Sequence, residues 1–95
     1  MNKPYNVEFD DNAKKSFKKL DKSVQRQILS WLNKNIEGSY NPRWTGKGLS
    51  ADKQGLWRYR VGKYRIICSI QDDIAIVLVV VADKRETVYD FNLKS

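Results

Sequence analysis

Residues 55–67, GLWRYRVGKYRII, constrain the fold more than any other part of the chain. The first half of this stretch alternates in the way that a half-exposed β-strand does, with three residues on its apolar side: Trp57, Tyr59 and Val61. Gly62 and Lys63 then supply a two-residue turn before a second strand. The stretch therefore predicts a tight β-hairpin in which Val61 pairs with Tyr64.

This pairing has a consequence for the arginines of the hairpin. It places Arg60 opposite Arg65 and Arg58 opposite Ile67, with opposed Cβ atoms about 4.5–5.5 Å apart. Two guanidinium groups held so close repel each other unless an anion lies between them, which favours a phosphate site. The alternative is that both side chains extend into water from an exposed sheet face.

The charge of the chain supports a polyanionic partner. The 95 residues carry a net charge of +7, and four of the six arginines follow position 55: Arg58, Arg60, Arg65 and Arg85. Arginine recognises phosphate in a planar, multidentate way, whereas lysine acts as a point charge. We therefore interpret the arginines as a candidate phosphate-binding site and the scattered lysines as the source of a general positive electrostatic field.

Residue types that are rare in the chain exclude several kinds of chemistry. There is no histidine and one cysteine, Cys68, so neither a zinc site nor a disulfide within the chain is expected. We expect Cys68 to be a core residue, and we expect no metal and no cofactor. The N-terminus has no apolar signal segment, and the run at 74–82 is too short to span a bilayer as a helix, so we expect a cytoplasmic protein without a membrane partner.

The order of elements predicts one α+β domain over residues 1–95. A short strand at 5–9 precedes a helix with apolar positions at Ala13, Phe17 and Leu20, and Asp21 or Ser23 starts a second helix that ends near Gly38. Residues 41–54 are predicted as a loop, and residues 74–81 as a central strand that is apolar on both faces. We expect two helices on one face of a twisted antiparallel sheet.

The first helix carries a lysine cluster on its polar faces. The sequence gives Lys14, Lys15 and Lys18 a candidate role in contacting a nucleic-acid backbone. The alternative interpretation is a solvated helix face. Lys63, in the hairpin turn, is a further candidate for RNA contact.

The hairpin, the apolar strand and the segment DKRETVYDF together resemble the RelE branch of the RelE/ParE superfamily of bacterial toxins. The resemblance covers nearly the whole chain and implies a microbial-RNase-like fold. It also implies a metal-independent endoribonuclease that enters the 70S ribosome and cuts mRNA in the A site, where a 2′-hydroxyl attacks the scissile phosphate. The partner implied is an antitoxin that wraps the toxin, and the positive charge of the chain predicts that this antitoxin is acidic.

Family roles transfer to individual residues of this chain. The resemblance assigns catalysis to Arg60, Arg65, Arg85 and Tyr89, and RNA contact to Arg58 and Lys84. Arg65 and Arg85 would stabilise charge on the phosphate, and Tyr89 would stack on or orient a nucleotide.

One departure from the family concerns proton transfer. A lysine considered as a proton carrier is replaced by arginine, which is effectively always protonated in proteins. Tyr89, Asp83 and Glu86 stay open as alternatives. Two other functions also stay open, namely a ParE-like inhibitor of DNA gyrase and an RNA-binding homologue without strong catalysis.

Overall fold

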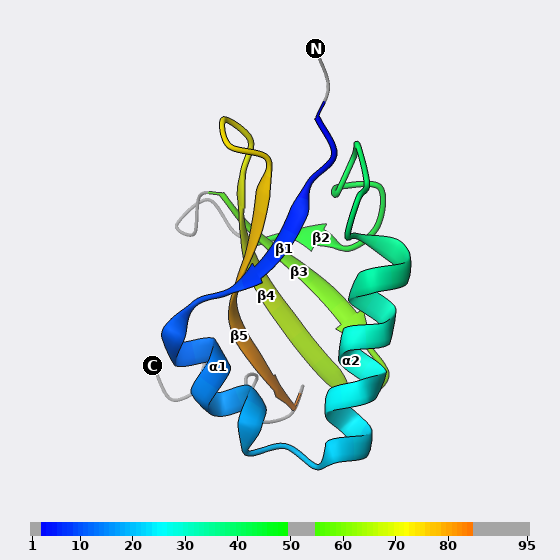
Figure 1. Cartoon of the computed structure of the whole chain (residues 1–95), viewed down its shortest axis with the longest axis vertical. Coiled ribbons are helices and arrows are strands. Elements are labelled where there is room, and N and C mark those ends of the chain that lie inside the picture. Colours follow the sequence, from blue (N-terminus) through cyan, green and yellow to red (C-terminus); the bar gives the residue numbers. More distant parts are fainter. Residues whose placement is uncertain (1–2, 50–54, 85–95) are drawn as a thin grey trace.

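The computed structural model describes residues 3–49 and 55–84, which form a five-stranded sheet and two helices (Figure 1). The strands lie in the order β1-β5-β4-β3-β2. In chain order the elements are β1 (Asn6–Phe9), α1 (Asp11–Lys18), α2 (Lys22–Asn35), β2 (Lys47–Gly48), β3 (Leu56–Val61), β4 (Tyr64–Gln71) and β5 (Ile76–Lys84). Both helices lie on one face of the sheet, which confirms the predicted α+β class.

Local sequence explains where the helices begin and which side they bury. The Asp10 carboxylate accepts a hydrogen bond of 2.8 Å from the Ala13 amide, which caps α1. Ala13 and Phe17 are the buried residues of α1, and the Phe17 ring packs 5.0 Å from the ring of Phe9. In α2 the buried positions are Ile28 and Leu32, one turn apart. The two helices thus close over the same core.

The predicted hairpin register is confirmed. Val61 pairs with Tyr64, Arg60 with Arg65 and Arg58 with Ile67. Gly62 has φ of +60°, which a residue with a side chain adopts only with strain, and this conformation suits the first position of a type II′ turn. The sequence pattern and the turn chemistry therefore agree on one register.

The three consecutive strands β3, β4 and β5 are antiparallel, as predicted, but the sheet as a whole is mixed. β1 pairs in parallel with β5, matching Asn6 with Ile76 and Phe9 with Val79. The two helices connect β1, at one edge of the sheet, to the strands at the other edge. β1 therefore pairs with the side of β5 that does not face β4. This pairing makes β5 a central strand, as its apolar character predicted.

The predicted loop at 41–54 contains a short strand instead of being loop throughout. Lys47 and Gly48 of β2 pair with Arg58 and Trp57 of β3. A Cβ atom on Gly46 would lie 2.5 Å from the Arg58 carbonyl oxygen, so only glycine permits this close approach. Contacts of this kind, between segments far apart in sequence, are not visible in local composition.

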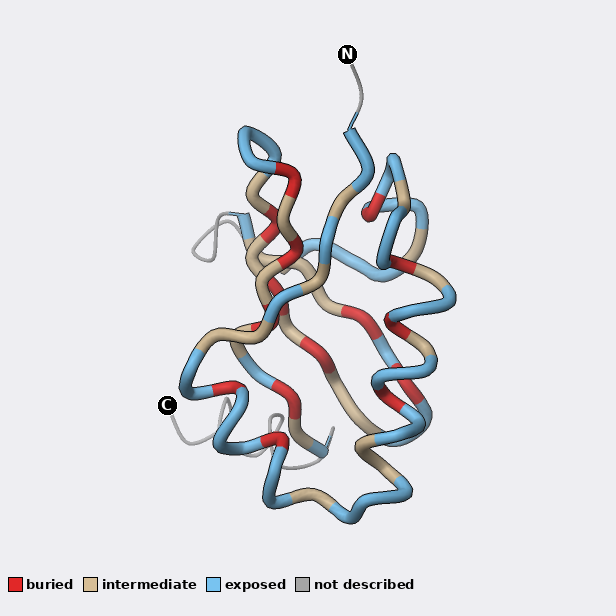
Figure 2. Tube along the Cα trace, in the orientation of Figure 1, coloured by how far each residue is buried: buried red, intermediate tan, exposed pale blue. Residues whose placement is uncertain are grey.

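Tyr59 is the residue where α2, β3 and the segment after α2 meet. Its side chain is fully buried, its ring lies 5.5 Å from the Trp31 ring, and its hydroxyl donates a hydrogen bond to the Pro42 carbonyl. Burial raises the pKa of the Tyr59 hydroxyl, so this group stays a donor across the ordinary pH range. Figure 2 shows buried residues alternating along the central strands beneath the helices.

The hydrogen bond from Tyr59 gives a first test of the fold. We expect Tyr59→Phe to lower the free energy of unfolding by about 1–3 kcal/mol, because the buried Pro42 carbonyl loses its donor. Urea titration of both proteins measures the change. Tyr40→Phe is the matched control, since Tyr40 is 62% exposed, and an equal loss in both variants would contradict the role given to this bond.

A polar cluster lies at the end of the sheet that carries the turn between β4 and β5. The Asp72 carboxylate accepts two hydrogen bonds from the Arg43 guanidinium, both of 3.0 Å, and one of 2.6 Å from the Tyr5 hydroxyl. These bonds, led by those from Arg43, lower the pKa of Asp72. The bond to Asp72 conversely raises the pKa of Tyr5. The cluster ties the turn between β4 and β5 to the segment after α2.

The cluster predicts a small dependence of stability on pH. Because its pKa is lowered in the fold, Asp72 stabilises the protein above its unfolded pKa of about 3.9, and this contribution is lost as pH falls through the folded value. The pair is well exposed, so we expect Asp72→Asn to remove less than about 1 kcal/mol at pH 7. Urea titrations at pH 7 and near pH 2 should show this difference disappear in acid. A similar effect from Asp73→Asn, at the exposed neighbouring position, would contradict it.

Candidate functional site

The candidate site lies on the sheet face opposite the helices. Trp57, Tyr59 and Val61 face the helical layer, so the alternation of β3 turns Arg58 and Arg60 to the other face, together with Arg65 of β4. No helix of the described residues covers this face (Figure 1). The three arginines therefore share one sheet face, called the open face below because no helix of the described residues lies on it, as the hairpin predicted.

Arg60 and Arg65 approach each other more closely than a general antiparallel pair. The pair that flanks the turn, Val61 and Tyr64, is hydrogen-bonded, so the next pair along is a non-hydrogen-bonded one. In such pairs the Cα atoms are only about 4.5 Å apart and the side chains are closer. The backbone thus holds the Cβ atoms of two arginines side by side at the turn end of the sheet.

A carboxylate completes this row on the third strand. Asp83 of β5 pairs directly with Arg65, so the row across β3, β4 and β5 is Arg60, Arg65 and Asp83. The next row is Arg58, Ile67 and Val81, and two of these three residues are apolar. Positive charge and a single acceptor carboxylate are therefore concentrated at the last row before the turn.

A β-bulge in β5 places Asp83 on this face of the sheet. The register of β5 against β4 shifts between Ile67 and Cys68, which leaves Val80 as an extra residue. Val79 and Ala82 are both fully buried beneath the helices, although they are three residues apart. Strict alternation would have put Asp83 on the helical face, and the extra residue reverses this.

The Nε atom of Arg65 is buried and has no acceptor among the described residues. A buried donor left without a partner costs about 1–3 kcal/mol, so the site favours an incoming acceptor. An anion placed between Arg60 and Arg65 would supply that acceptor and offset the repulsion between the two guanidinium groups.

The predicted RNA-contact lysines fall on different surfaces. Lys63 is exposed in the hairpin turn, next to the arginine row. Lys84 pairs with Tyr64, which places it on the helical side of the sheet at the exposed end of β5. The lysines of α1 are exposed on the helical layer, away from the arginine face: Lys14, Lys15 and Lys18. Arg85, Tyr89 and Glu86 lie outside the described residues.

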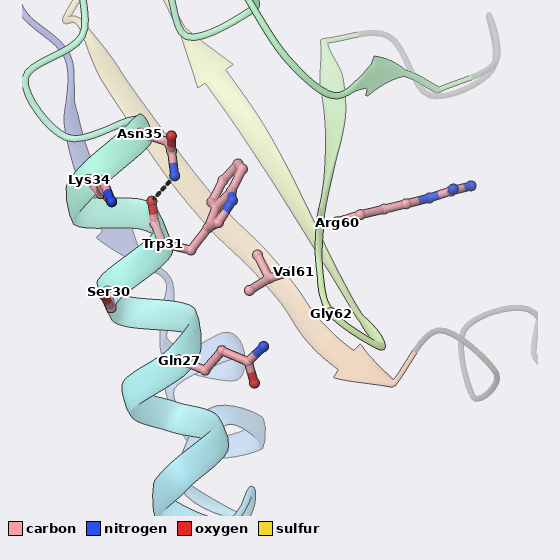
Figure 3. Close-up of a pocket in the computed structure, with 8 residues that line it drawn as sticks. All are labelled: Gln27, Ser30, Trp31, Lys34, Asn35, Arg60, Val61 and Gly62. Atoms are coloured by element: carbon pink, nitrogen blue, oxygen red, sulfur yellow. Dashed lines mark hydrogen bonds between the residues drawn. The ribbon is translucent and has the colours of Figure 1, made fainter.

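Sequence reasoning missed a hollow beside the hairpin. A cavity of about 290 Å³ separates α2 from the end of β3 (Figure 3). Gln27, Trp31 and Lys34 face it at intervals of four and three residues, which is the spacing of one helix face. That spacing is present in the sequence, but the prediction for α2 was based on the apolar residues of its buried face, which include Ile28 and Leu32.

The described residues form neither a candidate membrane span nor a candidate metal site. No helix among residues 3–49 and 55–84 is long and apolar enough to cross a membrane. In the same residues no group of three or more His, Cys, Asp or Glu side chains gathers into a candidate metal site. The single cysteine, Cys68, is buried, and burial raises the pKa of its thiol.

Comparison with known proteins gives consistent results. A family model described as the ParE toxin of the type II toxin–antitoxin system parDE matches residues 7–88. The chain is 31% identical over 91 residues to an Escherichia coli protein described as a RelE-like toxin protein, covering 96% of this chain and 94% of the relative. It is 27% identical over 86 residues to the toxin RelG of Mycobacterium tuberculosis, covering 90% and 97% of the two chains.

A solved structure has the same fold. A chain in the crystal structure of the toxin–antitoxin complex RelBE2 from Mycobacterium tuberculosis superposes with a TM-score of 0.77 at 26% identity. The match covers 86% of this chain and 92% of the other. This chain thus shares its fold with a chain of a toxin–antitoxin complex.

Repulsion within the arginine row predicts that the site lowers stability. We expect Arg60→Gln to raise the free energy of unfolding by about 0.2–1 kcal/mol at low ionic strength, because it removes a like charge opposite Arg65. The gain should shrink as salt screens the pair. Urea titrations in low and high salt measure it, with Arg26→Gln on the exposed surface of α2 as control. An equal gain in the control would show that only net charge matters.

Proposed function

The chain is a RelE-like toxin of the RelE/ParE superfamily, and from this membership we propose that it is an endoribonuclease that cleaves mRNA in the ribosomal A site. The observation that carries the proposal is the row of Arg60, Arg65 and Asp83 on the open face. It offers two arginines and one carboxylate, in directly paired positions on three neighbouring strands, to a phosphodiester.

The proposed reaction is an internal transfer within the RNA. A 2′-hydroxyl oxygen forms a bond to the adjacent phosphorus, and the bond from phosphorus to the 5′ oxygen of the next nucleotide breaks. The products are a 2′,3′-cyclic phosphate and a 5′-hydroxyl, so no water enters this step. One proton leaves the attacking hydroxyl and one is gained by the departing oxygen.

The arginines act on the charge that develops at phosphorus. Guanidinium donors aimed at the phosphate oxygens bind the transition state more strongly than the ground state when the protein fixes them in place beforehand. The non-hydrogen-bonded pair places the Cβ atoms of Arg60 and Arg65 side by side, which supports joint contact of both side chains with one phosphate. The unpaired Nε donor of Arg65 supports the same role. Arg58, one row further along, would bind a neighbouring phosphate.

Proton transfer needs a group other than arginine, because the arginine side chain stays protonated in proteins and cannot act as a base. The candidates are Tyr89, Asp83 and Glu86, and Asp83 is the candidate that falls within the described residues. Its place beside Arg65 supports a role as the acceptor of the 2′-hydroxyl proton. Arg85 and Tyr89 stay in the proposal as a further phosphate contact and a nucleotide-orienting ring.

The lysines are proposed to guide the toxin to ribosomal RNA and mRNA. Lys63 and Lys84 lie near the arginine row at the end of β5 and the hairpin turn. The α1 lysines form a separate positive surface on the helical layer. Two such surfaces suit a protein enclosed by nucleic acid on more than one side. We place this interaction in the cytoplasm, where ribosomes translate.

An antitoxin is the proposed regulatory partner. The RelBE2 structure that shares this fold is a toxin–antitoxin complex. The net charge of +7 supports an acidic antitoxin whose binding weakens as salt is added.

A second function is inhibition of DNA gyrase, because the matching family model is described as the ParE toxin. In that role the chain would bind a protein target and leave RNA intact. The arginine row favours the nuclease, since a protein-binding poison has no need of an unpaired donor at Arg65.

Ribosome-dependent cleavage tests the proposal. We expect the purified chain to cut mRNA in a translation reaction with ribosomes, at sites that map to the A-site codon. Arg65→Ala should reduce the rate on the order of 10²-fold, since it removes one preorganised charge contact. Arg26→Ala removes an exposed arginine of α2 and should leave the rate unchanged.

Other outcomes separate the alternatives. Intact mRNA together with inhibited supercoiling by DNA gyrase would support the ParE-like function in place of the nuclease. Binding to ribosomes without any cut would support an RNA-binding homologue without catalysis.

A further inference from the structure

The hollow beside α2 contains an indole group that lacks an acceptor among the described residues. Trp44 donates its indole N–H to the Asn35 carbonyl at 3.0 Å. Trp57 donates to the Thr45 carbonyl at 2.7 Å. Trp31, which is half-buried and lines the hollow, donates its indole N–H to no described residue. A tryptophan at such a position usually finds an acceptor, so the hollow holds a donor for a ligand.

Gln27 gives the hollow a second group with spare hydrogen-bonding capacity. Its amide can donate two hydrogen bonds and accept two, and it forms none with the described residues. The amide lies against the hairpin turn, because a Cβ atom on Gly62 would lie 2.9 Å from its nitrogen. Figure 3 shows Gln27 and Trp31 turned toward Val61 from successive turns of α2. The two side chains therefore offer donors and an acceptor to one molecule.

The ring of Trp31 is a flat surface that the core holds in place. It lies 5.5 Å from the fully buried Tyr59 ring, with the two planes tilted by 51°. The Asn35 side chain donates a 2.9 Å hydrogen bond to the Trp31 carbonyl, which fixes the end of α2 beside the ring. Proteins that recognise single-stranded RNA stack unpaired bases on aromatic side chains of this kind.

The charge and size of the hollow indicate which ligand fits. Its volume of about 290 Å³ falls just below the range of about 300–1,000 Å³ for pockets that hold drug-sized molecules. None of the eight lining residues is acidic and two are basic: Gln27, Ser30, Trp31, Lys34, Asn35, Arg60, Val61 and Gly62. A flat base with one phosphate matches this lining, with the ring at Trp31 and the phosphate at Lys34.

Arg60 connects the hollow to the arginine row. It lines the hollow, and it pairs with Arg65 on the open face. Figure 3 shows Val61 pointing toward α2 while the Arg60 side chain extends away from it. An RNA strand that crosses the sheet edge at the hairpin turn therefore passes directly from the row to the hollow.

We propose that the hollow binds one unpaired nucleotide of the RNA substrate. Its base stacks on the Trp31 ring and exchanges hydrogen bonds with the Gln27 amide, and its phosphate contacts Lys34. The inference rests on the proposed function in one respect, since the RNA is then the strand that the arginine row cleaves. Trp31 acts as a positioning residue in this arrangement, because it lies on the other side of the sheet from the scissile phosphate.

Side-chain NMR resonances of the isolated chain test the site. Nitrogen-15 spectra are recorded while adenosine 5′-monophosphate or a 2′-O-methyl adenosine trinucleotide, which lacks the attacking hydroxyl, is added. We expect the Trp31 indole and Gln27 amide resonances to shift with both ligands and to reach saturation. The indole resonances of Trp44 and Trp57 are internal controls, since their N–H groups already bond to carbonyls.

Substitution of Trp31 tests the stacked base. Trp31→Leu should weaken binding of adenosine 5′-monophosphate by about tenfold or more, as expected for loss of one stacking contact. Trp31→Phe keeps an aromatic ring and should retain most of the affinity. The Gln27 amide resonance reports binding in both variants. Trp44→Leu is the matched control, because Trp44 is 57% exposed and lies outside the hollow.

Substitution of Lys34 tests the phosphate. Lys34→Gln should lower the affinity for adenosine 5′-monophosphate by about fivefold and leave the affinity for adenosine, which has no phosphate, unchanged. Lys22→Gln is the control on the same helix, about 18 Å away along its axis and beyond the Debye length of about 8 Å at physiological salt. Both lysines are exposed, so this pair tests the inference even where Trp31→Leu disturbs the packing on Tyr59.

The outcomes separate the inference from the proposed function. Trp31 and Gln27 resonances that stay in place with both ligands would overturn the inference, and the cleavage assay would still judge the nuclease. Equal shifts with inorganic phosphate alone would overturn the bound base. Binding of the mononucleotide without the trinucleotide would overturn RNA as its source and assign the hollow to a free nucleotide. Saturable binding of both by a chain that leaves mRNA intact would support the nucleotide site and overturn the nuclease.

Discussion

The register of β3 against β4 is the constraint on which the open face depends. A strand has a side-chain period of two, so a slip of one residue would bury Arg58 and Arg60 and expose Tyr59. Two features resist that slip. Gly62 takes the left-handed conformation that a two-residue turn requires, and Tyr59 is fixed by the Trp31 ring and the Pro42 carbonyl. The pairing of Arg60 with Arg65 is therefore imposed by the core on the other side of the same strands.

Much of this arrangement could be predicted from the sequence because its signals are local. The alternation at 57–61 and the turn at Gly62 gave the hairpin, its register and the shared face of the arginines, all of which the structure confirms. Helical spacing gave the buried positions Ala13, Phe17 and Ile28. Apolar residues that recur at helix or strand spacing, and glycines at turns, can be recognised from the few residues on either side of them.

Contacts between distant segments could not be predicted in this way. The parallel pairing of β1 with β5 depends on which edge the crossover leaves free, and β2 depends on the close approach of Gly46 to β3. For the candidate site, the sequence identified Arg60 and Arg65, but it left Asp83 as one of three proton acceptors without a place. The hollow beside α2 was missed because it needs both a helix face and a strand edge, and only their packing brings them together.

The extra residue in β5 means that the strand can lose one codon without losing its register. Val80 has no partner on β4, because Val79 pairs with Cys68 and Val81 pairs with Ile67. In-frame loss of the Val80 codon would therefore leave a regular ladder in which Asp83 still lies opposite Arg65. In-frame insertion of one codon after Val81 would instead shift Asp83 by one position and turn it toward the helical layer. The gene thus tolerates one change of length in this strand and is sensitive to the opposite change.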